Sequence, residues 1–296
     1  MQRYLILAVS AVLWTAGDLA AQELVWKLNK GDRFFVHTAA KTRQSMKFMG
    51  QEVPQEFAQK TVTRVDVKEK SPETIVIAYT TEKMEIDAGA GLDPKLFKAL
   101  EGLTVSVHLD PKTFKARKVE GYKELVEKAA GNDPLLQNVL RVVLTEDFFM
   151  SNVESQFGFL PAAPGTVSKG QRWQQTGSIP MGPLGKLEVT KEFTYEGPVD
   201  KDGKTLDKIS YKITNSKFTL PANKQGFAPG VEFSKADLKV TSGSGVYYFD
   251  RAAGRLLSSD DKVVMSGQME IEAMGNKVVL EIKNETEAST TVKDTK

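Results

Sequence analysis

Apolar and polar side chains alternate with a period of two over long stretches of the chain, a pattern typical of strands with one buried face. From Arg33 to Phe48 the even positions carry the more apolar side chains, and the odd positions carry most of the lysine, arginine and serine. The stretch "MGQEVP" then turns the chain, and residues 57–67 return with their apolar residues on the same side. We therefore predict a long antiparallel hairpin, followed by a third strand over residues 74–86.

The period lengthens to that of a helix in two places. Residues 93–102 predict a short helix, because Asp93 suits the N-cap position. Residues 121–158 predict a longer helical block that stops at Gly131 and restarts at Pro134. Its apolar stripe should pack on something apolar, either as ordinary core or as a lid over a ligand cavity. The stripe consists of Leu136, Val139, Leu140, Val143, Leu144, Phe149, Val153 and Phe157.

A connector, "GFLPAAPGTVSKG", separates these elements from a second group of strands, and it is rich in proline, glycine and small residues. Residues 186–219 then alternate as two strands around an Asp-Gly turn. Residues 236–292 give further hairpins, which turn near residues 250–254 and at residues 275–276.

A weak internal duplication relates the two halves. The motif Lys-Gly-polar-Arg-aromatic around Gly31 recurs around Gly170, and Asp110 in a hairpin turn is echoed by Asp250 at almost the same offset. These residues suit turns and strand starts, so we expect the same strand order in both halves and not a doubled ligand site. A third echo links "SMKFMGQEV" to "MEIEAMGNKV", in which methionine-bearing strands run into a Met-Gly turn.

Together these patterns predict a mainly β protein. Two pseudo-repeated antiparallel meanders should form a curved sheet, a barrel or a sandwich, with a few inserted helices. We expect the first half to cover residues 22–160, with a helical insert at 121–158, and the second half to cover residues 161–296. A sheet of this size has to curl in order to bury one face and protect its edges.

Residues 1–21 have the features of a signal peptide, since Arg3 precedes an apolar run and small residues lead to a cleavage site after Ala21. The run is too short to span a bilayer comfortably, so we expect an exported mature chain without an integral membrane segment, in the periplasm or the medium. The absence of cysteine excludes disulfides, thiolate nucleophiles and thiolate metal sites. A net charge of +2, with lysines spread along alternating strand positions, predicts a solvated sheet face and no nucleic-acid partner.

No motif in the sequence points to catalysis, to a metal or to a cofactor. The two histidines, His37 and His108, fall on the less apolar strand faces and have no cysteine to complete a zinc site. Ser259 precedes Lys262 by three residues, but positions three apart on a strand face opposite ways. We therefore expect a non-catalytic protein, while carboxylates assembled from distant strands leave a hydrolase as an alternative.

The sharpest binding hypothesis concerns the buried face of the first hairpin, which mixes polar and apolar side chains. A solid core seldom accepts so many polar groups in one row unless they pair across the strands, and methionine suits surfaces that adapt to varied apolar partners. We hypothesise a cavity or groove between this hairpin and the last hairpin of the second half, which takes an elongated apolar molecule with a polar end. A packed core with threonine pairs across the strands is the alternative. The residues expected to line the groove are Thr42, Gln44, Met46, Phe48, Thr61, Met265 and Met269.

Long hairpins that open on Met-Gly-Gln, Lys-Gly-aromatic strand starts and a signal peptide together resemble an uncharacterised family of exported bacterial proteins, a domain of unknown function. The general plan is also similar to that of the curved-sheet periplasmic lipoprotein carriers. The first resemblance supplies no catalytic residue, and the second implies an apolar ligand. We therefore expect an envelope or secreted protein that binds or scaffolds another envelope component, with a carrier of an apolar or lipid-like ligand as the more specific alternative.

Overall fold

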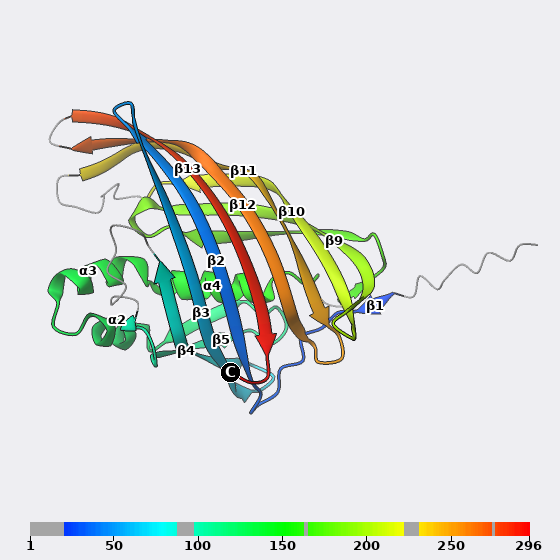
Figure 1. Ribbon diagram of the computed structural model, residues 1–296. Coiled ribbons are helices and arrows are strands. Elements are labelled where there is room, and N and C mark those ends of the chain that lie inside the picture. Colours follow the sequence, from blue (N-terminus) through cyan, green and yellow to red (C-terminus); the bar gives the residue numbers. More distant parts are fainter. Residues whose placement is uncertain (1–20, 88–97, 163–164, 222–230, 274–275) are drawn as a thin grey trace, which may run out of the picture.

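One large curved sheet dominates the computed structural model, which describes residues 21–87, 98–162, 165–221, 231–273 and 276–296 (Figure 1). Its 11 strands are antiparallel and follow the order β6-β5-β4-β3-β2-β13-β12-β11-β10-β9-β8. The fold is therefore mainly β, as the alternating pattern predicts. The sheet is open, because its two outermost strands, β6 and β8, do not pair with each other.

The strands follow the chain in two consecutive runs. The first half runs from the middle of the sheet to one edge, through β2 (Arg33–Phe48), β3 (Gln51–Lys70), β4 (Ile75–Asp87), β5 (Thr104–Leu109) and β6 (Ala116–Glu120). The second half runs from the other edge back to the middle, through β8 (Arg172–Pro180), β9 (Lys186–Lys201), β10 (Lys204–Thr219), β11 (Val231–Asp250), β12 (Arg255–Ala273) and β13 (Asn276–Lys293). Two short strands, β1 (Gln22–Glu23) and β7 (Thr166–Val167), form a separate pair.

The two halves meet where β13 pairs with β2. Their register extends from Leu280 opposite Phe48 to Lys293 opposite Phe35, so nearly the whole of β2 is covered. The last strand of the chain therefore lies beside the first long strand, in the middle of the sheet.

The predicted duplication is visible in strand order and in hydrogen bonding. Strands β2 to β6 and strands β8 to β12 are both simple meanders. The backbone N–H of Gly31 donates to the carbonyl of Val67 at 2.9 Å, and that of Gly170 donates to the carbonyl of Tyr195 at 2.8 Å. Each glycine therefore joins the start of the first strand of its half to the second strand.

The aspartate turns of the two halves also correspond. Oδ1 of Asp110 accepts a hydrogen bond from the backbone N–H of Thr113 at 2.8 Å, and Oδ1 of Asp250 accepts one from that of Ala253 at 2.9 Å. Hydrogen bonds that the Asp110 carboxylate accepts from the backbone N–H groups of Thr113 and Lys112 lower its pKa to about 2. These residues have structural roles in turns, as expected from the sequence.

Replacing Gly31 or Gly170 by alanine should therefore destabilise the protein by about the same amount, roughly 1–2 kcal/mol. Both have positive φ, at 92° and 84°, and a Cβ on either would meet no atom within 4 Å, so only backbone strain contributes. Urea denaturation measures the two losses, with Gly177→Ala as the control because Gly177 has equal space and no positive φ. Clearly unequal losses at Gly31 and Gly170 would contradict the equivalence of the two turns.

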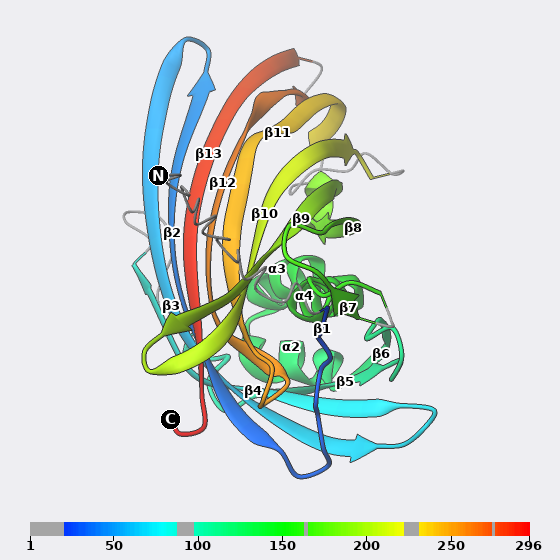
Figure 2. The ribbon, with the colours of Figure 1, turned by 90° about the vertical axis from the view of Figure 1, so that its right-hand side faces the viewer.

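The helices occupy the block that helical spacing predicts: α2 (Tyr122–Ala130), α3 (Pro134–Val143) and α4 (Glu146–Phe157). A 3-10 turn, η1 (Gly182–Leu184), lies between β8 and β9. Figure 2 shows the three helices inside the curve of the sheet, against its lower part. Residues 93–97 of the short helix expected at 93–102 lie outside the described residues, and so does the Met-Gly turn at 274–275.

Helix α4 lies at the gap between the two edges of the sheet and contacts both β6 and β8. The side chains of Glu154 and Glu146 accept hydrogen bonds from the backbone N–H groups of Ala116 and Val119 in β6, each at 3.1 Å. In β8, the side-chain amide of Gln175 donates to a backbone carbonyl just after α4. The helix thus satisfies two backbone groups of the β6 edge and, with the segment that follows it, bridges the seam that the strands leave open.

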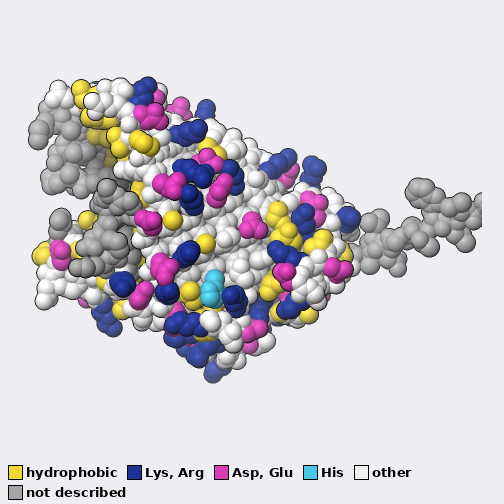
Figure 3. Space-filling view, viewed as in Figure 1, with side chains coloured by type: hydrophobic (Ala, Val, Ile, Leu, Met, Phe, Trp, Pro, Cys, Tyr) yellow, Lys and Arg dark blue, Asp and Glu magenta, His cyan; other side chains and the backbone are white. Residues whose placement is uncertain are grey.

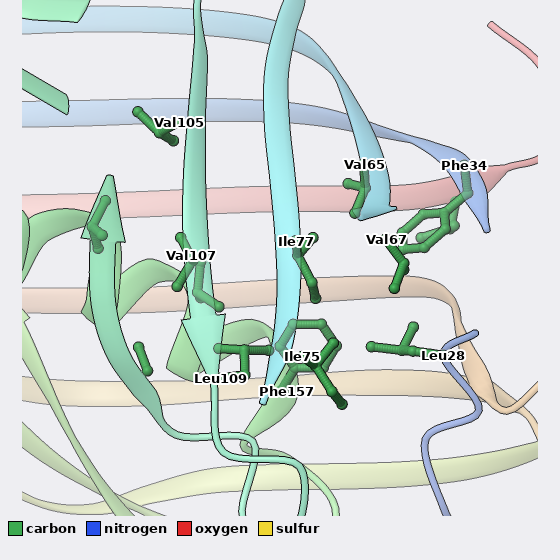
Figure 4. Packing of buried hydrophobic residues seen from close by; sticks show 14 of the residues in the cluster. Leu28, Phe34, Val65, Val67, Ile75, Ile77, Val105, Val107, Leu109 and Phe157 are labelled. Carbon is green, nitrogen blue, oxygen red and sulfur yellow. The ribbon is translucent and has the colours of Figure 1, made fainter. Parts of the chain in front are cut away.

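The inner face of the sheet forms a dry core in three clusters: two lie beneath the helices, and a third, small one of Phe233, Leu238 and Met269 lies toward the other end of β11 and β12. The first cluster packs aliphatic side chains of β3 to β6 against α4 (Figure 4), and the second is mainly aromatic. Trp26, from the N-terminal segment, lies between them, with its ring centroid 4.8 Å from that of Phe157 and 5.4 Å from that of Phe249. Its indole N–H donates to the carbonyl of Phe157 at 3.1 Å. The N-terminal segment is therefore part of the core.

The expectation that the whole helical stripe is buried was wrong for α3. Leu140 and Leu144 do pack against the first core cluster. Val139 and Val143, in contrast, are 53% and 42% exposed. The reason is position: α3 packs mainly against α2 and η1, so it lies at the margin of the helical layer and not flat on the sheet.

Candidate functional site

The inner face of the sheet continues beyond the helices toward the end where β2 turns into β3, which we call the distal end. Figure 2 shows α2, α3 and α4 below this upper part of β2, β11, β12 and β13. Of the described helical elements, η1 reaches it, because Leu184 packs on Phe233, Leu238 and Met269. The strand register and the alternation of side chains place ten apolar residues on this part of the inner face. This distal apolar face consists of Met46, Phe48, Val53, Phe57, Val263, Met265, Ile271, Val278, Leu280 and Ile282.

Water reaches the distal apolar face but not the core that continues from it. Phe48 and Val53 are 44% and 46% exposed, and the other eight residues are half-buried. On the same inner face under the helices, Val65, Ile77 and Val107 are completely buried. Because uncovered apolar surface in a continuous patch marks binding sites, this contrast makes the distal apolar face the candidate site.

The outer face of the same strands is charged and solvated, as the spread of lysines predicts (Figure 3). Ion pairs join neighbouring strands, such as Lys41 with Glu56 at 2.7 Å and Lys262 with Glu285 at 2.6 Å. Such exposed pairs add little stability, but they keep this face wet. The apolar side chains of the distal strands are therefore concentrated on one side.

A shallow depression crosses the middle of the sheet. Its side chains come largely from the outer register, including Ala39, Lys41, Ala58 and Lys60. A shallow depression lined by alanines and solvated lysines cannot enclose a ligand. We therefore place the site on the inner face and not in this depression.

The structure places all seven sequence-predicted lining residues on the inner face. Met46, Phe48 and Met265 belong to the distal apolar face, whereas Met269 is only 1% exposed and packs with Phe233 and Leu238. The two hairpins are neighbours in one sheet and do not face each other across a gap. They therefore contribute adjacent strips of a single surface.

Threonine pairing across the strands, the alternative interpretation of the polar positions, is also present. The hydroxyls of Thr42 and Thr286 are 3.0 Å apart, and the side-chain amide of Gln59 donates to the hydroxyl of Thr61 at 2.9 Å. The polar side chains in the middle of the inner face thus satisfy one another. Of the apolar residues beyond them, Met265, Ile271 and Ile282 pack against the buried side chains of a small cluster, Phe233, Leu238 and Met269. The others of the distal apolar face do not belong to a buried cluster of the described residues.

A polar cluster that the sequence did not reveal lies where the core ends and the distal apolar face begins. Oδ1 of Asp261 accepts a hydrogen bond from the hydroxyl of Tyr211 at 2.7 Å, and Oδ2 accepts one from the hydroxyl of Ser259 at 3.2 Å. The ammonium of Lys191 lies 4.4 Å from the centre of the Tyr211 ring. The cluster thus combines one carboxylate, hydroxyls and one cation on the inner face.

Two glycines of β11 make this cluster possible. Tyr211 in β10 reaches Asp261 in β12 across the intervening strand, because Gly245 has no side chain in the way. A Cβ on Gly245 would lie 2.5 Å from the Tyr211 ring and 2.6 Å from the Asp261 carboxylate, and one on Gly243 would lie 2.4 Å from Ile213. The Gly-Ser-Gly sequence in a strand was the signal that could have located the cluster.

Burial changes the charge balance within the cluster. Burial lowers the pKa of the Lys191 ammonium, and attraction to Asp261 offsets only part of this effect. Burial and the nearby Asp261 carboxylate raise the pKa values of Tyr211 and Tyr247 well above the usual tyrosine range. Both phenols are therefore neutral hydrogen-bond donors at neutral pH.

The other residues considered from the sequence lie apart from this cluster. His37 and His108 point to the outer face, and burial lowers the pKa of His37. Ser259 is buried on the inner face, while Lys262 is exposed on the outer face, as expected for strand positions three apart.

Within the described ranges, no three histidines, aspartates or glutamates gather as metal ligands. No helix in the described part of the chain has the length and apolarity needed to cross a membrane.

Comparisons with known proteins place the fold only distantly. No protein-family model matches the chain, and no curated protein matches it in sequence. The chain is similar to a structure described as "lipid-protein interactions in lipovitellin", with 9% identity and a TM-score of 0.41 over 88% of this chain and 25% of that one. It therefore spans about a quarter of the length of lipovitellin.

Two further solved structures are similar at a lower level. The outer membrane protein OprG of Pseudomonas aeruginosa has 10% identity and a TM-score of 0.20 over 89% of this chain and 97% of that one. A DUF1329 family protein of Desulfovibrio piger has 9% identity and a TM-score of 0.16 over 86% of this chain and 85% of that one. These likenesses are distant and assign no family by sequence.

Proposed function

We propose that this protein is a non-catalytic binder of a long apolar chain, such as the acyl chain of a lipid-like molecule, which lies along the distal apolar face. The observation that carries the proposal is the change along one continuous inner face. Under the helices it is dry and packed, whereas beyond them the ten residues of the distal apolar face stay half-buried or exposed around a small buried cluster of Phe233, Leu238 and Met269. A folded protein retains such a surface at a cost in solubility, which is offset when a ligand covers it.

The shape of the face favours an elongated ligand over a compact one. From Thr42 to Phe48 the inner positions of β2 extend over about 20 Å, since each strand residue adds about 3.3 Å. The neighbouring strands β3, β13 and β12 present apolar residues in parallel with it. Methionines 46 and 265 adapt to chains of different shape. An extended acyl chain therefore fits both the length and the chemistry of the surface.

The proposal gives a reason for the absence of a catalytic constellation among the described residues. The carboxylate of Asp261 is engaged by the hydroxyls of Tyr211 and Ser259, and no second carboxylate is hydrogen-bonded within this cluster. We further propose that the protein acts outside the cytoplasm after removal of residues 1–21, where it would carry or hold an apolar ligand. Scaffolding of another envelope component is the remaining use of such a surface.

Binding of an environment-sensitive fluorescent fatty acid should test the proposal. The folded wild-type protein is expected to bind the probe, and Leu280→Glu should weaken binding by at least about tenfold, because a carboxylate then lies on the distal apolar face. Val279→Glu is the matched control. It adds the same charge one residue away, on the outer face, where Val279 is 48% exposed.

Melting curves will check that both variants are folded, and Phe48→Ser provides a milder change on the same face. Equal binding by the Leu280 and Val279 variants would contradict the proposed site. A folded wild-type protein that binds no apolar probe would contradict the proposed function and leave scaffolding as the better explanation of the surface.

A further inference from the structure

Lys191 of β9 lies beside the distal apolar face, three strands from β12. In β9 it is opposite Ile213 of β10, whose side chain lies against Gly243 of β11. Gly243 is in turn opposite Val263 of β12, which belongs to the distal apolar face. The lysine therefore lies in the first row of side chains from which the apolar surface extends toward the tip of the sheet.

The ammonium of Lys191 has no ion-pair partner within the described part of the chain. Its charge lies over the ring of Tyr211, 4.4 Å from the ring centre. Other lysines of the sheet do pair: Lys212, on the outer face of the next strand, is 2.9 Å from Glu192. A half-buried cation without a carboxylate costs free energy that an anionic ligand group can recover.

The nearby carboxylate does not neutralise this lysine by direct contact. Asp261 influences Lys191 only through space, because its oxygens accept from the hydroxyls of Tyr211 and Ser259. These hydroxyl protons are committed to Asp261. The free hydrogen-bond donors of the cluster are thus the N–H groups of Lys191, which select an acceptor with negative charge.

We infer that Lys191 binds the anionic head of an amphiphile whose acyl chain lies along the distal apolar face, so that the protein selects long-chain acids over neutral molecules of equal length. This inference rests on the proposed function and names the ligand class for it. The head lies beside Tyr211 of β10, and the chain crosses β11 obliquely toward Met265 and the tip of the sheet. Apolar burial supplies the affinity, and the single charge contact supplies the selectivity.

Competition against the fluorescent fatty acid measures this selectivity with three ligands: palmitate, cetyl alcohol and a lysophosphatidic acid with the same chain. Wild-type protein should bind palmitate about tenfold more tightly than cetyl alcohol, the value of one charge-assisted contact. Lys191→Met should remove that preference and leave cetyl alcohol binding unchanged, whereas Lys191→Arg should retain it. Lys212→Met is the control, since it removes a lysine of the outer face from the neighbouring strand.

The outcomes separate the inference from the proposed function. Equal binding of palmitate and cetyl alcohol by wild-type protein, or an unchanged preference in Lys191→Met, overturns the role of Lys191 while acyl-chain binding stands. Absence of all binding overturns both. Preference for lysophosphatidic acid over palmitate, lost in Lys191→Met, identifies a phosphate head as the anion. Lys191→Gln repeats the test if the methionine variant does not fold.

Discussion

Replacing Arg251 by methionine should destabilise the protein by about 3–5 kcal/mol, because it leaves a buried carboxylate without its cation. Asp207 is 1% exposed, and its Oδ2 accepts a hydrogen bond from Nε of Arg251 at 2.9 Å. The terminal guanidinium nitrogen of Arg251 contacts the other oxygen, Oδ1, which also accepts from the hydroxyl of Tyr195 at 2.5 Å. After substitution only the tyrosine contact remains, and the charge cannot reach water.

Chemical denaturation of Arg251→Met measures this loss. The double variant Asp207→Asn, Arg251→Met should be more stable than the single variant, because removal of the stranded charge recovers part of the penalty. A double variant that is no more stable than Arg251→Met would show that lost packing, and not the unpaired charge, causes the destabilisation. Lys204→Met, which removes an exposed partner of Asp250, should cost less than about 1 kcal/mol.

Replacing Phe157 by alanine should destabilise the protein by a comparable amount, about 3–5 kcal/mol. Phe157 is 3% exposed at the end of α4, with its ring centroid 4.8 Å from that of Trp26 and 5.5 Å from that of Phe114. Its loss would leave a cavity between the N-terminal segment, the sheet and the helix that bridges the two edges. The backbone around it cannot close this space without breaking the bridge.

Two measurements check this second prediction. Denaturation gives the free energy lost, and tryptophan fluorescence of the native state should shift because water approaches Trp26. Ser155→Ala, at an exposed position of the same helix, should change stability by less than about 0.5 kcal/mol. A Phe157→Ala variant as stable as Ser155→Ala would show that α4 does not hold the seam.

The sequence predicts those parts of the fold that depend on neighbours along the chain. The bounds of β2, the stop of α2 at Gly131 and the turns at Gly31 and Gly170 all follow from period, from turn residues and from backbone conformation. These signals are local, so a single sequence contains them. The exposure of Val139 was not predictable in the same way, because it depends on which elements α3 packs against.

The features of the candidate site likewise include some that local sequence predicts and others that depend on tertiary packing. The inner position of Met46 and Phe48 follows from strand alternation, whereas their exposure depends on where the helical layer ends. Lys191 and Asp261 come from strands β9 and β12, and their proximity requires both the sheet order and a strand without side chains between them. Sequence spacing contains neither fact. Only the pair of glycines at 243 and 245 hints at it.

The pairing of β13 with β2 determines when the sheet can be completed during folding. Thr38 and Thr290, which approach each other across that pair, are 252 residues apart in the sequence. The two half-sheets can join only after β13, the last strand of the chain, has been made. Long-range pairing of this kind carries a large loop-closure entropy and predicts slow folding. Until the halves join, one edge of the long strand β2 is unpaired. The unfinished chain is therefore most vulnerable to aggregation at β2, although this strand lies in the middle of the completed sheet.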